Sequence, residues 1–142
     1  MVAATAALSG LSTSMFAVAN TELGPFLRQV DDLSRQVEAA RVAILAESLA
    51  RGVVAASDCP SATSWVIQWA PSLRAGGAAQ LVAVAHATRA VRNAGLAAAV
   101  LGARVGVRNA AVVLAEMDKL GPRAAGRTHR HLRERGGVPG PP

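Results

Sequence analysis

The sequence has very few aromatic residues and almost no cysteine. Its 142 residues include two Trp, two Phe and no Tyr, and Cys59 is the single cysteine. One cysteine cannot form an internal disulfide, which indicates a structural thiol in a reducing compartment and a cytoplasmic location. Without aromatic side chains the core must be built largely from small aliphatic residues, many of them alanine, so its helices must pack closely.

Acidic residues are missing from a long central stretch of the chain. No Asp or Glu occurs between Cys59 and Ala115, and the formal net charge is +6. The residues before Cys59 hold six acids and four arginines, which sum to −2, whereas the rest holds eleven basic residues and three acids, which sum to +8. This asymmetry favours a polyanionic partner, most simply DNA. Arginine-rich codon usage without any partner is the alternative that the charge leaves open.

Membrane-spanning runs and strand patterns are also missing. No apolar run approaches the ~18 residues that a membrane span requires, so we expect no membrane partner. No segment alternates between apolar and polar residues as a half-buried strand does, and the alanine-rich composition favours helix. The sequence therefore predicts an all-α fold: a small multi-helix bundle with one long N-terminal helix, two helix-turn-helix-like units and disordered ends.

Composition divides the chain into three parts. Residues 1–20 are uncharged and mostly small, and they predict a disordered N-terminal arm. Residues 21–120 carry the helical patterns and form the predicted domain. Residues 121–142 are rich in Arg, Gly and Pro, with too little apolar surface to offset the entropy of ordering, so they predict a disordered tail, with a short helix near 128–135 left open.

The long helix is predicted from about Pro25 to Arg51. Proline is suited to the first turn of a helix, and Gly52 is suited to a left-handed stop. Its apolar residues recur at alternating spacings of four and three, which indicates one apolar stripe: Phe26, Val30, Leu33, Val37, Ala40 and Ile44. We expect this stripe to pack onto the rest of the domain. Homo-oligomerisation through the same helix is the alternative, because the spacing is also that of a coiled coil.

The later helices are predicted at about 61–69, 77–92, 94–101 and 107–120, separated by Gly and Pro. Trp65 and Trp69 are four residues apart and share one face of the first of these helices. We expect both to be core anchors, since an indole buries much area. Base stacking is the functional alternative and needs exposed rings beside basic residues.

Five arginines of the central stretch are the candidate nucleic-acid-binding residues. We expect them to contact phosphates, which positions the chain without reading bases. Two of them lie where the last helix begins, a position at which free backbone amides also favour anions. The five are Arg74, Arg89, Arg92, Arg104 and Arg108.

The sequence shows none of the residue groupings that catalysis or metal binding requires. We see no nucleophile with a base, no phosphate loop and no paired carboxylates in an apolar setting. His129 and His131 form a pair without the third and fourth ligands that a metal site needs. We therefore predict no catalytic residue, no metal, no cofactor and no enzymatic activity.

Three segments carry a resemblance to a known family. They are LRQVDDLSRQVEAARVAILAESLARGVV, CPSATSWVIQWAPSLRAGGAAQLVAVAHATRAV and LAAAVLGARVGVRNAAVVLAEMDKL. Together, over residues 21–120, they resemble the N-terminal helical domain, a domain of unknown function, of the actinobacterial 13E12 repeat family of HNH-endonuclease-associated proteins. Members often continue into an HNH nuclease domain. The resemblance therefore implies an all-α domain that works beside DNA.

The nuclease part of that family has no counterpart in this chain. It would bring a Cys-x-x-Cys pair and a His-Asn-His constellation for metal-assisted hydrolysis. Here there is one cysteine, and the three histidines are His86, His129 and His131. The family pattern also stops after Leu120, which suggests a truncated gene or a frameshift. The expected function is a non-catalytic, DNA-associating accessory domain. The alternatives are a protein-interaction or oligomerisation module and a non-functional gene fragment.

Overall fold

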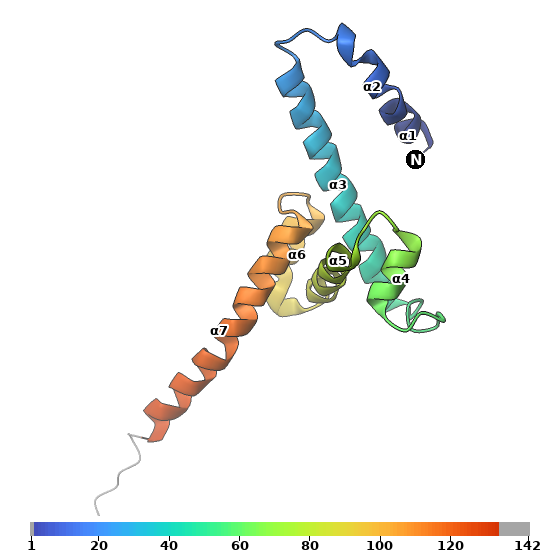
Figure 1. Ribbon diagram of the computed structural model, residues 1–142. Helices are drawn as coiled ribbons and strands as arrows, with labels where there is room; N and C mark the ends of the chain where they lie inside the picture. The colour runs from blue at the N-terminus through green and yellow to red at the C-terminus, as the bar shows by residue number, and fades with distance from the viewer. Residues whose placement is uncertain (1, 134–142) are drawn as a thin grey trace, which may run out of the picture.

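The computed structural model describes residues 2–133, and within that range helices are present and strands are not (Figure 1). The predicted all-α class is confirmed. The short 3₁₀ turns are Met15–Ala17 and Val91–Asn93. The α-helices are α1 (Val2–Ser9), α2 (Leu11–Ser14), α3 (Leu23–Ala50), α4 (Ala62–Trp69), α5 (Ala75–Thr88), α6 (Ala94–Leu101) and α7 (Val107–Arg133).

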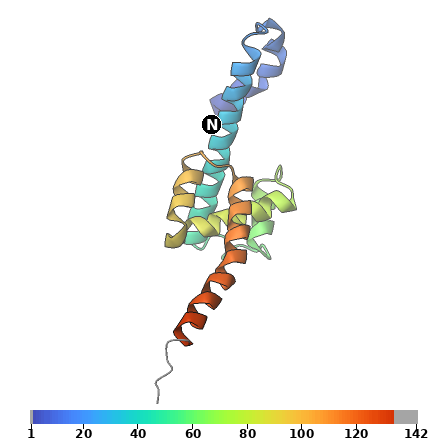
Figure 2. The same cartoon turned by 90° about the vertical axis from the view of Figure 1, so that its left-hand side faces the viewer.

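Helix α5 lies at the centre of the bundle. It contacts α3, α4, α6 and α7, while α3 also contacts α6 and α7. The two helix-turn-helix-like units are α4–α5 and α6–α7, and in each unit the two helices touch. Figures 1 and 2 show the long helices α3 and α7 projecting from the bundle in opposite directions. Within the described chain, α1 and α2 contact each other and the adjoining 3₁₀ turn but no later helix.

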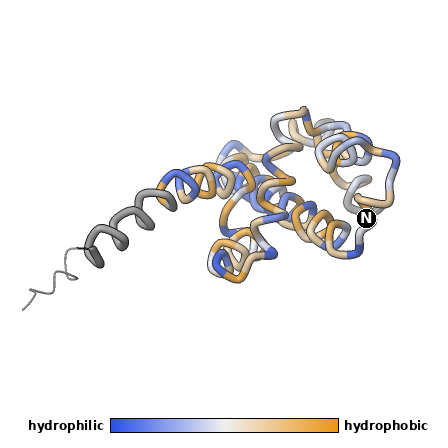
Figure 3. The backbone as a smooth tube through the Cα atoms, turned by 90° about the horizontal axis from the view of Figure 1, so that it is seen from below, coloured by the Kyte–Doolittle hydropathy of each residue, from blue (hydrophilic) through white to orange (hydrophobic). Residues whose placement is uncertain are grey.

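The core is aliphatic and built from small side chains. Its largest fully buried side chains are one leucine and three valines, Leu45, Val42, Val84 and Val100. Three alanines, Ala78 and Ala85 of α5 and Ala110 of α7, are 0% exposed, and their methyl side chains let neighbouring helices approach closely. Hydrophobic residues extend along the helices of the bundle in Figure 3. The expected alanine-based packing is confirmed.

Helix α3 ends in the left-handed glycine that the sequence predicts. Gly52 has φ +72°, and its amide donates to the Leu49 carbonyl at 3.3 Å. The Val53 amide donates to the Ser48 carbonyl at 3.0 Å. These two bonds are those of a Schellman motif, which satisfies carbonyls that the helix end leaves unpaired.

We expect Gly52→Ala to lower the free energy of unfolding by about 1 kcal/mol, because a Cβ is strained at this φ. Urea denaturation followed by circular dichroism measures the change. Gly24→Ala is the matched control. Gly24 lies in the first turn of α3 with open space around it, so the same substitution should be neutral or stabilising there. Equal losses in the two variants would contradict the role of Gly52.

Both predicted disordered ends contain helix instead. The arm at 1–20 includes α1 and α2, whose alanine-rich sequence has high helix propensity. The predicted end of the last helix at Leu120 is wrong, since α7 continues to Arg133. Gly121 and Pro122 cost the helix stability, but a proline removes a single hydrogen bond and the following Ala and Arg residues favour helix. The remainder of the predicted disordered tail, 134–142, lies outside the described residues.

The remaining predicted boundaries differ from the structure by small amounts. Helix α4 begins after Ser61, whose Oγ accepts a hydrogen bond from the Ser64 amide at 3.1 Å. Helix α6 has the predicted bounds. Helix α5 is shorter than predicted because Ala90 is extended, at φ −89° and ψ 126°. That break separates α5 from the following 3₁₀ turn.

The stripe on α3 does not face the bundle as expected. The α3 residues that the bundle buries are Ala39, Val42 and Leu45, which lie on another side of the helix. The predicted stripe points away from the bundle: Ile44 is 62% exposed, while Phe26 and Val30 are half-buried. The spacing correctly predicts an apolar face, but it does not tell which of two apolar faces the neighbouring helices will cover.

Candidate nucleic-acid interface

The five predicted arginines are all exposed. Among residues whose side chains the structure describes, none of the five takes part in an ion pair. They are held by four elements and their connections. Arg74 and Arg89 are the N-cap and C-cap of α5, Arg92 lies in the 3₁₀ turn, Arg104 lies between α6 and α7, and Arg108 lies in the first turn of α7.

The arginines divide into two groups and do not form one patch. Arg74 and Arg89 lie at opposite ends of α5, whose 14 residues span about 21 Å. Arg92 follows Arg89, so these two mark the end of α5. At the other end, one small hollow is lined by Leu73, Gly77 and Arg108, which places the start of α5 beside the start of α7. Arg74 and Arg104 adjoin this hollow in sequence, since Arg74 follows Leu73 and Arg104 lies three residues before Val107.

A sixth arginine, which the sequence analysis missed, lines the same hollow. Arg41 comes from α3, is half-buried and lines the hollow together with Arg108. It was overlooked because it belongs to the half of the chain in which acids outnumber arginines. Only the packing of α3 against α5 and α7 brings it here.

One carboxylate also enters this hollow. Glu38 of α3 reaches the start of α7, where its Oε2 accepts a hydrogen bond from the Val107 amide at 3.1 Å. A Cβ at Gly106 would lie 3.1 Å from the same oxygen, so the glycine leaves room for the carboxylate. The prediction that free amides at this helix start attract a phosphate is therefore corrected for Val107, because an acid of the same chain already holds its amide.

The first amides of α5 are in a different situation. Arg74 occupies the N-cap and provides no side-chain acceptor for them. The first turn includes Gly76, around which a Cβ would find no atom within 4 Å. This end of the bundle thus combines exposed cations with an open helix start, and both favour anions.

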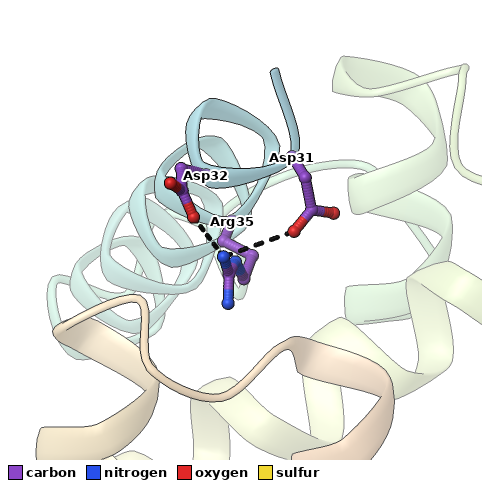
Figure 4. A network of polar contacts seen from close by, with 3 residues as sticks. All are labelled: Asp31, Asp32 and Arg35. Atoms are coloured by element: carbon purple, nitrogen blue, oxygen red, sulfur yellow. Dashed lines mark hydrogen bonds and ion pairs between the residues drawn. The ribbon is translucent and has the colours of Figure 1, made fainter. Parts of the chain in front are cut away.

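Two arginines in the first half of the chain, Arg35 and Arg51, are paired with acids close to them in sequence. Arg35 forms ion pairs with both Asp31 and Asp32, and its Nη2 lies 3.3 Å from Asp31 Oδ2 (Figure 4). Arg51 Nε lies 2.6 Å from Glu47 Oε1. The contrast with the five candidate arginines follows directly from the acid-free stretch of sequence.

The two tryptophans have unequal environments. Trp65 is half-buried and packs against the core, as predicted. Trp69 is 69% exposed, so its prediction as a core anchor is wrong. The two rings lie 6.4 Å apart between centroids, tilted by 50°. They border a groove of about 390 Å³, whose other wall on α3 includes Arg41 and Ile44. Trp69 is exposed because α4 packs on α5 and does not approach α3 closely enough to close this groove.

No cluster of three or more His, Cys, Asp or Glu residues that could hold a metal ion occurs among the described residues. Within the same range, no helix combines the length and the apolar character needed to cross a membrane. Compared with known proteins, the chain matches no family model, no curated protein and no solved structure. The resemblance drawn from the sequence stays a prediction.

Proposed function

We propose that the chain is a non-catalytic, DNA-associating accessory domain. The observation that carries the proposal is that all five candidate arginines are exposed and lack an acidic partner among the described side chains. Unpaired surface arginines bind phosphates and release counterions, which supplies affinity without sequence preference. The resemblance to HNH-endonuclease-associated proteins points to the same setting.

The spacing of the two arginine groups would let both contact a single DNA duplex. Their separation along α5, about 21 Å, corresponds to roughly six base pairs at about 3.4 Å each. Arg74, Arg104 and Arg108 would contact phosphates at one end of this span, and Arg89 and Arg92 at the other. Glu38 lies among the first group and lowers the attraction there.

Fluorescence anisotropy with a labelled duplex of mixed sequence tests the proposal. We expect the logarithm of the binding constant to fall linearly with the logarithm of salt concentration, by about 0.9 for each phosphate contact. The variant R74Q/R104Q/R108Q should have a slope smaller by about 2 to 3 and an affinity at low salt lower by at least about tenfold. Every variant keeps the full chain, so the arginine-rich end stays constant.

The matched control is R51Q, since Arg51 is an exposed arginine already paired with Glu47. It should leave both slope and affinity nearly unchanged. Two outcomes would contradict the proposal. The first is binding that does not weaken between low and moderate salt. The second is an effect of R51Q as large as that of the triple variant, counted per arginine removed. Self-association is a second candidate function, which the outward-facing stripe of α3 favours.

A further inference from the structure

Helix α3 has two apolar faces, and the bundle covers only one of them. At roughly 100° per residue, the stripe from Phe26 to Ile44 lies about 150° around the axis from the buried face of Ala39, Val42 and Leu45. The first half of α3 carries the ion pairs of Arg35 on the side of the buried face (Figure 4). Charge is thus kept off the stripe, which remains apolar along its length.

Large apolar side chains on the stripe are accessible to solvent. Leu33, Val37 and Ile44 are 37%, 44% and 62% exposed. In heptad terms the a positions are Val30, Val37 and Ile44, and the d positions are Phe26, Leu33 and Ala40. The flanking positions are mainly uncharged, and they include Gln29, Ser34 and Gln36. The seam therefore has the composition of a helix–helix interface and little that would repel an identical seam.

The described chain leaves much of the first half of α3 uncovered: Phe26 and Val30 are half-buried, and the residues between them are exposed. This half projects beyond the bundle, and α1 and α2 do not contact it (Figures 1 and 2). A lone helix of about 15 residues is marginal in water, because most helix stability comes from packing an apolar face. A partner helix with the same 3-4 spacing would supply that packing.

We propose that a second copy of the chain covers this face, with the two α3 helices antiparallel. The stripe is self-complementary in this direction, because positions whose numbers add to 70 face each other. Phe26 then meets Ile44 of the second copy, Val30 meets Ala40, and Leu33 meets Val37. The two-fold axis passes near position 35, where the flanking residues Ser34 and Gln36 are uncharged and bring no like-charge contact.

The groove at Trp69 selects the antiparallel direction. Ile44 belongs both to the stripe and to this groove. In the antiparallel pair, the groove receives the first turns of α3 from the second copy. These turns carry Leu23 and Leu27, which are 43% and 70% exposed. The exposed tryptophan and the exposed first turns of α3 would therefore cover each other.

Electrostatic repulsion favours the same direction. The chain from Cys59 onward carries a net charge of +8. A parallel pair places the two basic bundles side by side, whereas the antiparallel pair separates their attachment points by about 27 Å, the length of 18 helical residues. That distance exceeds the screening length of about 8 Å at physiological salt.

Multi-angle light scattering on the full chain without DNA measures the association. We expect a mass twice the 14.5 kDa of one chain. The variant L33Q/V37Q should raise the dimer Kd by about a hundredfold or more, because each chain loses two apolar seam positions. The matched control R28Q changes an exposed residue on the opposite side of α3 and should stay dimeric. A cooperative unfolding transition in urea shows that the bundle remains folded in both variants. A monomer at high concentration, or equal effects of the two variants, overturns the proposal.

Cysteine cross-linking tests the direction. On a C59S background, chains carrying V30C and chains carrying A40C are mixed and oxidised. The antiparallel pair gives the mixed V30C–A40C dimer, and either chain alone gives little product. Efficient cross-linking of V30C to itself overturns the antiparallel assignment. Because DNA takes no part in either experiment, their outcome is independent of the proposed DNA association.

Discussion

Replacing Leu45 with alanine is expected to lower the free energy of unfolding by about 3 kcal/mol. Leu45 is 2% exposed and is the largest of the fully buried side chains. Its neighbours in the core are mainly valine and alanine, which cannot extend to refill the space. Since a small domain has only about 5–15 kcal/mol of stability, this one change removes a large part of it. Urea denaturation monitored by circular dichroism measures the loss.

The control for this prediction is Leu120→Ala. Leu120 is 60% exposed on the part of α7 that has left the bundle, so its truncation should cost under about 0.5 kcal/mol. A loss at Leu45 no larger than that at Leu120 would mean that the buried core does not determine stability. It would also mean that the packing of α3 against the later helices is wrong.

The second large effect is expected at Glu38. Glu38→Ala removes the acceptor of the Val107 amide and should lower the free energy of unfolding by about 2 kcal/mol, as is usual when a partly buried donor loses a charged partner. The same variant removes the negative charge beside Arg41 and Arg108. DNA affinity at low salt should therefore rise by about threefold, roughly 0.7 kcal/mol. Chemical denaturation and anisotropy measure the two changes on one sample.

Glu47→Ala separates the local effect from the change in net charge. Glu47 is also an acid of α3, but it pairs only with exposed Arg51 and lies away from the hollow. Its loss should cost under about 0.5 kcal/mol and leave DNA affinity nearly unchanged. If Glu38→Ala and Glu47→Ala behaved alike in both measurements, then Glu38 would neither cap α7 nor lower the attraction of its surroundings for phosphate.

Local sequence signals predicted the fold well where one residue decides an element boundary. Gly52 ends α3 through its φ of +72°, and α4 begins within one residue of its predicted start, where the Ser61 hydroxyl caps it. The turn after Leu120 was mispredicted because Gly-Pro usually ends a helix, whereas α7 continues across it. Propensity is a weak signal when favourable and unfavourable residues follow each other within a few positions.

The candidate site was predicted less completely, because it depends on contacts between distant segments. Exposure of the five arginines follows from their charge and from the missing acids. Their division into two groups could not be predicted from the sequence, since it depends on the position of α5 relative to α7. Neither Arg41 nor Glu38 could be found from the sequence, because α3 carries both residues to a hollow formed by helices that begin 37 and 69 residues after Glu38. The exposure of Trp69 likewise depends on the distance that α4 keeps from α3.

The dependence of α3 on helices that come much later in the chain has a consequence during synthesis. Leu45 leaves the ribosome 65 residues ahead of Ala110, which is roughly 3 to 13 seconds at about 5–20 residues per second. Until α5 and then α7 follow, the later helices leave both apolar sides of α3 uncovered. A nascent chain that has released α3 but not yet α5 would therefore be prone to aggregate, whereas one that has also released the start of α7 could bury its core.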